Sequence, residues 1–143
     1  MKFLYATLIL LLNLHAQSLK DSKFEDVIVS KVTSIYDGDT FRVNIKDYPK
    51  IIGYRIPVRV NGIDTPELRA QCIKEKNLAR TAKKITVRLL RNAKTIELKN
   101  IKRGKYFRIV ADVYVDGKLL SEILLQNKVA VRYDGGKKID WCK

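Results

Sequence analysis

The stretch YDGDTFRV, residues 36–43, lies between two runs in which apolar and polar residues alternate. An Asp-Gly pair in that setting is a strong hairpin signal, because the glycine supplies the backbone freedom that a tight turn needs. The alternation predicts strands over residues 27–36 and 40–46. By turn chemistry alone, a structural role for Asp37 and Asp39 ranks ahead of a functional one.

The rest of the chain predicts a small barrel. A third strand is expected over residues 54–63, followed by a helix over residues 68–91 whose apolar residues recur at helical spacing: Leu78, Ala82, Ile85 and Leu89. Two more strands, a short helix and an extended segment are then expected over residues 95–99, 107–115, 119–127 and 129–133. This order indicates a mainly β fold of the α+β class, a five-stranded OB-fold barrel with two to three helices.

The first residues form a separate segment. Lys2 precedes an uncharged apolar run over residues 3–14, which is too short to span a bilayer as a helix and is followed by a passable signal-peptidase site. We expect residues 1–16 to be a cleaved secretory signal, with an uncleaved membrane anchor as the alternative. Residues 17–143 are then expected to form a single domain that is periplasmic or secreted, without stable membrane insertion.

The composition limits the chemistry. The chain has 29 Lys plus Arg against 15 Asp plus Glu, a formal net charge of +14, and so should attract polyanions such as nucleic acids, anionic lipids or glycans. Its single histidine, His15, lies in the predicted signal. Ser-His and Cys-His catalysis are therefore excluded from the mature chain. The two cysteines, Cys72 and Cys142, are an even pair in a chain bound for an oxidising compartment and predict a disulfide.

A second acidic stretch, IDTPELR at residues 63–69, follows the third strand. A helix start explains it well, with Thr65 as N-cap and Glu67 at the positive end of the helix. Yet Arg59 and Arg108 each project from a strand face opposite their apolar neighbours. Acids and arginines together can hold a phosphodiester, because carboxylates bind a hard cation and guanidinium groups bind phosphate oxygens.

The order of these motifs resembles the staphylococcal nuclease (thermonuclease) family. The resemblance rests on DGDT at residues 37–40, Arg59 five residues before DTPE at residues 64–67, KYFR at residues 105–108 and YVDGK at residues 114–118. It covers roughly residues 27–133. It implies a monomeric, calcium-dependent nuclease of no sugar specificity, which cuts DNA and RNA to leave 3′-phosphate and 5′-hydroxyl ends.

The resemblance also implies roles for individual residues. Asp39, Asp64 and the backbone carbonyl of Thr65 would bind one Ca²⁺ per chain, with Asp37 as an outer-shell acid. The remaining residues would act on the substrate. Glu67 would orient or deprotonate the attacking water. Arg59 and Arg108 would be the catalytic arginines that bind the phosphate. Lys105 and Tyr106 would contact the outer phosphate.

The chain also departs from that family. The predicted helix follows Glu67 almost directly, so a loop that many members carry is expected to be short. The disulfide is expected to tie down the C-terminal tail, with Trp141 as an apolar plug. Tyr133 and Lys137 either lie beside the site or belong to a tail that only packs.

Two other functions remain open. The alternative is a noncatalytic OB-fold protein that holds single-stranded nucleic acid with basic residues and tyrosines. A basic adhesin or membrane-surface protein would explain the charge but not the acids. The presence of all the acids and both arginines favours catalysis.

Overall fold

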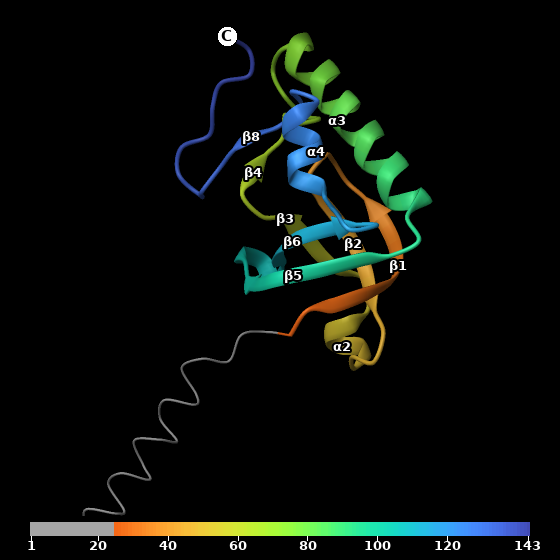
Figure 1. Ribbon diagram of the computed structural model, residues 1–143. Coiled ribbons are helices and arrows are strands. Elements are labelled where there is room, and N and C mark those ends of the chain that lie inside the picture. Colours follow the sequence, from red (N-terminus) through yellow and green to blue (C-terminus); the bar gives the residue numbers. More distant parts are fainter. Residues whose placement is uncertain (1–24) are drawn as a thin grey trace, which may run out of the picture.

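The structure is a computed structural model that describes residues 25–143, so the predicted signal over residues 1–16 lies outside the described residues. Figure 1 labels the elements along the chain. They are β1 (Val27–Ile35), β2 (Thr40–Ile45), α2 (Lys50–Gly53), β3 (Ile56–Val60), β4 (Ile63–Asp64), α3 (Ile73–Asn92), β5 (Ile96–Arg103), the 3₁₀ turn η1 (Lys105–Phe107), β6 (Ile109–Val115), β7 (Lys118–Leu119), α4 (Leu120–Gln126) and β8 (Val131–Arg132).

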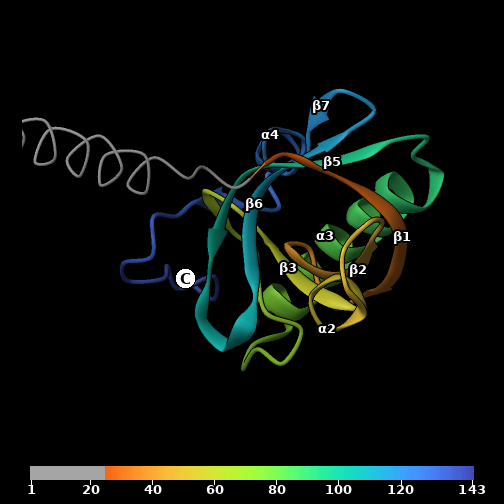
Figure 2. The same cartoon turned by 90° about the horizontal axis from the view of Figure 1, so that it is seen from below.

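The barrel closes where β3 runs parallel to β6. The sheet order is β3-β2-β1-β5-β6-β7, and a further pairing joins β3 back to β6, with Arg59 opposite Val110. The neighbouring pairs around the described barrel are antiparallel. Figure 2 shows these strands around the barrel. Five strands closed in this way, with helices α2, α3 and α4, confirm the predicted α+β fold of OB type.

Alternation along β3 decides what faces the core. Ile56, Val58 and Val60 are buried, while Arg59 between them is half-buried on the opposite face. Because successive side chains of a strand point to opposite faces, the apolar residues pack inside the barrel and the arginine lies outside it. The predicted facing of these side chains is confirmed, but the strand is shorter than the predicted residues 54–63, because a turn at residues 61–62 separates β3 from β4.

Helix α3 packs closely against the turn between β1 and β2. The buried residues of α3 are Ala79, Ala82, Thr86 and Leu90. Three of them follow directly after Leu78, Ile85 and Leu89 of the predicted apolar stripe, which are only partly buried. Small side chains let the helix approach the turn. Thr86 Oγ1 donates to the Gly38 carbonyl at 2.7 Å, and a Cβ added to Gly38 would lie 2.8 Å from the Ala82 Cβ.

The predicted start of helix α3 was wrong. The helix begins at Ile73 and not near residue 68, because its N-cap is Cys72, whose sulfur accepts from the Glu75 amide at 3.4 Å. Thr65 does not cap it, since Thr65 is buried and its amide donates to Asp39 Oδ2 at 3.0 Å. A loop therefore separates Glu67 from the helix.

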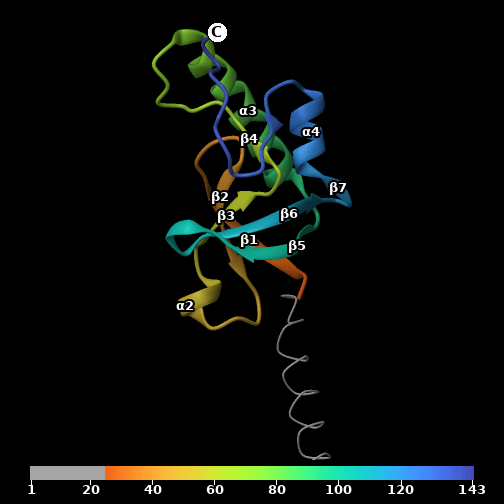
Figure 3. The same ribbon diagram turned by 90° about the vertical axis from the view of Figure 1, so that its left-hand side faces the viewer.

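The C-terminal segment returns to the middle of the chain. β8 pairs with β4, so that Val131 lies opposite Asp64, and the Tyr133 amide donates to the Gly62 carbonyl at 3.0 Å. The chain then ends near the start of α3, as Figures 1 and 3 both show. Across residues 25–143 no helix is both long and apolar enough to cross a membrane.

Candidate metal and phosphate site

The acidic turn has a structural role and also places a second carboxylate in the site. Asp37 Oδ1 accepts from the amides of Asp39 and Thr40 at 3.1 and 2.7 Å, which closes the turn. The Asp39 side chain is not used in that way. It is 1 % exposed and points toward Arg59 and Thr65. The turn predicted from Asp-Gly thus also places Asp39 at the site.

Arg59 bridges two buried aspartates. Its Nη1 lies 2.8 Å from Asp39 Oδ1 and its Nη2 lies 2.8 Å from Asp64 Oδ1. Both aspartates are 1 % exposed, whereas Arg59 keeps 16 % of its side chain exposed. The pairing of β2 with β3 sets Thr40 opposite Arg59 and so brings the neighbouring Asp39 to the arginine, while Asp64 follows on β4. Both terminal nitrogens of Arg59 are thus bonded to carboxylates, and a guanidinium group is also able to bind phosphate oxygens.

The site holds more negative charge than its arginine offsets. Burial, followed by the neighbouring charge of Asp39, raises the pKa of Asp37 to about 7. Burial also raises the pKa of Asp39, although Arg59 opposes the rise. Burial disfavours the charge on Arg59, but Asp39 and Asp64 outweigh it and raise the pKa of Arg59. Close carboxylates that resist ionisation are a fitting environment for a bound cation.

Glu67 lies at the rim of the site. Its amide donates to Glu75 Oε1 at 3.0 Å, and its half-exposed carboxylate pairs with Lys138 Nζ at 2.7 Å. The same ammonium lies 3.0 Å from Asp64 Oδ1. For Lys137 two alternatives were predicted, a place beside the site or a tail that only packs. Lys137 forms no ion pair within the described residues, because the tail directs its neighbour toward the acids.

Tyr133 lies beside the site, which is one of the two alternatives predicted for it. Its ring centroid is 5.9 Å from the Arg59 guanidinium carbon, within reach of a cation–π contact. Trp141 is half-buried, and its indole nitrogen is buried with no partner among residues 25–143. The aromatic plug expected in the tail therefore covers part of the fold but is not fully enclosed.

The second arginine is placed by β6 and is not joined to the acids. Arg108 precedes β6 by one residue in an extended conformation, so it projects from the same face as Val110, which lies opposite Arg59. Its Nε is buried without a hydrogen-bond partner in the described part of the chain. Arg108 therefore keeps an unpaired donor on the face of Arg59, and a guanidinium group is a preferred partner of phosphate oxygens.

The loop before Arg108 is exposed and unusual in its backbone. Tyr106 is 91 % exposed, and Tyr106 and Phe107 both have φ of 58°. Such angles favour glycine, because a Cβ is strained there. Lys105 is also exposed, and within residues 25–143 no hydrogen bond or ion pair joins Lys105 or Tyr106 to the buried aspartates. Their predicted contact with a substrate phosphate remains a prediction.

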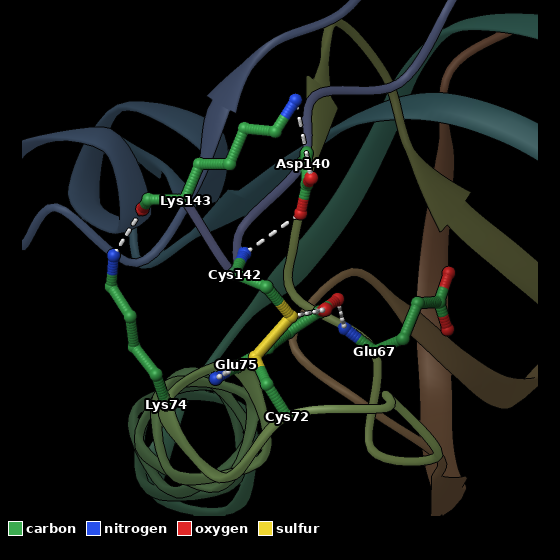
Figure 4. The surroundings of a disulfide bond; sticks show 7 residues. All are labelled: Glu67, Cys72, Lys74, Glu75, Asp140, Cys142 and Lys143. Carbon is green, nitrogen blue, oxygen red and sulfur yellow. Dashed lines mark hydrogen bonds and ion pairs between the residues drawn. A yellow bond between two sulfur atoms is a disulfide. The ribbon is translucent and has the colours of Figure 1, made fainter.

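The disulfide between Cys72 and Cys142 is confirmed, with a Cα–Cα distance of 6.0 Å. Figure 4 shows it at the start of α3, with Glu67 on the neighbouring loop. The Lys143 carbonyl accepts from Lys74 Nζ close by. The C-terminal tail is thus fixed at α3 and crosses the rim of the acidic site.

The fold and the site together indicate the class of protein. Barrels of the OB type commonly bind oligonucleotides on one face, and here the acids and arginines form a group suited to nucleic-acid phosphates. A family model described as "Staphylococcal nuclease homologue" matches residues 57–140, more than half of the chain. The chain therefore belongs to the staphylococcal nuclease family, which supports a nuclease function. A comparison with curated proteins found no match.

Proposed function

We propose that this protein is an exported, calcium-dependent nuclease that hydrolyses DNA and RNA to 3′-phosphate and 5′-hydroxyl products. The observation that carries the proposal is the Arg59 bridge, 2.8 Å from each of two aspartates that are 1 % exposed. A buried ion pair adds little net stability, because its charges lose their hydration. Stability alone therefore does not explain why these acids cluster around an arginine in a basic barrel. The net charge of +14 would attract the polyanionic substrate.

The oxygen atoms of this site fit a hard cation. Asp39, Asp64 and the Thr65 carbonyl would hold one Ca²⁺, with Asp37 at the outer shell, where it already orders the turn. Ca²⁺ prefers carboxylate and carbonyl oxygens, and burial raises the pKa values of Asp37 and Asp39, so a bound cation would favour their charged forms. When bound, the cation supplies positive charge that stabilises the phosphate in its transition state.

The protein residues would do the remaining work. Arg59 and Arg108 lie on one face of the β3–β6 pair and would bind phosphate oxygens as their charge grows. Glu67, half-exposed at the rim, would orient or deprotonate the attacking water. Lys105 and the exposed Tyr106 would contact an outer phosphate of the chain being cut.

The decisive experiment uses the purified chain over residues 17–143 with single- and double-stranded DNA and RNA. Cleavage and the chemical nature of the ends are measured in Ca²⁺ and in a chelator. Ca²⁺-dependent cutting that leaves 3′-phosphates supports the proposal. Tight binding without cutting in any divalent metal would instead make the protein a noncatalytic OB-fold binder.

Glu67→Gln tests the role of the acid at the rim. Because the amide cannot accept a proton from water, we expect cleavage to fall by about 10²-fold or more, the range for a lost general base. DNA binding and the far-ultraviolet circular dichroism spectrum should stay unchanged, since Glu67 is half-exposed. Cleavage at the wild-type rate would remove Glu67 from the mechanism.

Export is tested separately. We propose that residues 1–16 are removed and that the mature protein is periplasmic or secreted. Fractionation of producing cells, followed by N-terminal sequencing, should find a chain that starts near Gln17 outside the cytoplasm. A full-length chain in the membrane fraction would support the anchor alternative.

A further inference from the structure

The tail over residues 133–142 is fixed at both ends, and its middle lies over the acids. At one end the Tyr133 amide donates to the Gly62 carbonyl, next to the pairing of β8 with β4. At the other end Cys142 is bonded to Cys72 at the start of α3. The two anchors flank the loop that carries Asp64 and Glu67. The short span between them restricts where the tail can place its side chains.

Lys138 uses this position to place a positive charge in the site. Its ammonium lies 3.0 Å from Asp64 Oδ1 and 2.7 Å from Glu67 Oε1. A lysine side chain is a cation at neutral pH, and the Lys138 ammonium shares Asp64 Oδ1 with Arg59.

Lys138 is not what holds the tail in place. The disulfide and the hydrogen bond from Lys74 to the Lys143 carbonyl join the far end of the tail to the start of α3. The contacts of Lys138 with the two acids are therefore additional to the anchoring of the tail.

We propose that Lys138 is a tethered competitor for the metal ion at Asp64, and that the Cys72–Cys142 disulfide keeps it there. This inference rests on the proposed function, in which Asp64 binds the metal. A divalent cation on Asp64 would lie a few ångströms from the Lys138 ammonium, and like charges at that distance repel strongly in a partly buried site. Metal binding must then displace Lys138, and the tether opposes the displacement.

The test measures metal affinity without any substrate. Ca²⁺ is titrated by calorimetry into the metal-free protein at fixed ionic strength, and Tb³⁺ luminescence provides an independent reading. Lys138→Met, which keeps the length of the chain without its charge, should bind Ca²⁺ about tenfold more tightly, the order expected when one nearby charge is removed from a solvated site. Lys137→Met is the matched control and should bind as the wild type does.

Two further variants separate charge from packing and from the tether. Lys138→Arg keeps the charge and should restore the wild-type affinity, which a role in packing alone would not require. The double variant Cys72→Ser/Cys142→Ser releases the tail and should also tighten Ca²⁺ binding. Adding Lys138→Met to that double variant should then change the affinity little, because the lysine has already left the site.

The outcomes distinguish this inference from the function on which it rests. If no variant binds Ca²⁺ or Tb³⁺, the proposed metal site is wrong and the inference falls with it. If the wild type, Lys138→Met and Lys137→Met bind with equal affinity, the metal site stands and the competition by Lys138 is refuted. Weaker binding by Lys138→Met would show that the lysine supports the metal site, which also overturns the proposal.

Discussion

Among single residues, Arg59 and Arg108 differ in their surroundings, although both are proposed to bind the phosphate. Arg59 neutralises two buried aspartates, whereas Arg108 has no ion pair among residues 25–143. Removing one partner of a buried ion pair leaves the other charge uncompensated, which costs stability. The two arginines should therefore differ in what their loss does to folding.

This difference can be measured in metal-free protein. We expect Arg59→Met to lower the free energy of unfolding by about 3 kcal/mol, the lower end for a broken buried pair. Arg108→Met should change it by less than about 1 kcal/mol, as for residues without such a partner. Urea denaturation provides both values, and cleavage should fall in both variants. Equal destabilisation would contradict the bridge seen at Arg59.

Asp37 predicts a pH dependence of stability. Its pKa is raised from 3.8 to about 7 in the folded protein, so between these values the folded state holds a proton that the unfolded state has lost. This proton contributes about 4 kcal/mol to the free energy of unfolding. The contribution is fully present below the unfolded pKa and is lost as the pH rises to about 7.

Asp37→Asn isolates this effect, because its amide oxygen can still accept from the amides of Asp39 and Thr40. In a chelator, the variant should melt at a higher temperature than the wild type at pH 8, and the gap should close toward pH 4. The melting temperatures at pH 4 serve as the control for those at pH 8. A gap that stays constant with pH would show that Asp37 does not titrate in this range.

At the scale of elements, the contact of α3 with the β1–β2 turn depends on small side chains. Gly38 lies against Ala82 and Thr65, and an added Cβ would come within 2.8 and 2.9 Å of their side-chain carbons. The periodicity of the sequence identified a helix with an apolar stripe here. It did not identify which residues touch the turn, since Thr86 is polar and is buried through its bond to the Gly38 carbonyl.

Gly38→Ala tests this close approach. Overpacking a well-filled contact costs about 1–3 kcal/mol, so the variant should melt at a lower temperature. Because the turn carries Asp39, its metal affinity should fall as well. An unchanged melting temperature would mean that the helix and the turn are further apart than the structure shows.

At the scale of the whole molecule, the disulfide closes a loop over a sequence separation of 70 residues. In the chain-entropy model such a loop contributes roughly 4 kcal/mol to stability. Under oxidising conditions Cys142→Ser should therefore melt at a lower temperature than the wild type. Under reducing conditions the two should melt together, and a difference that persists there would point to a role of Cys142 other than the bond.

Much of the fold follows from local patterns. Alternation along residues 54–63 predicted which face of β3 enters the core, and the order of the motifs indicated the family that the match over residues 57–140 supports. The start of α3 was placed too early, because Thr65 and Glu67 have the residue types of a helix start. Tertiary contacts use Thr65 to hold Asp39 in place of capping the helix.

Residue types and short-range spacing were enough to predict the barrel class, most of its strands, the cysteine pair and the set of acids and arginines. That Arg59 joins Asp39 to Asp64, and that Lys138 reaches Asp64 from the tail, became visible in the folded chain alone. Those contacts depend on how β2 pairs with β3 and on where the disulfide holds the tail. Long-range geometry of this kind has no signature in the local pattern of residues.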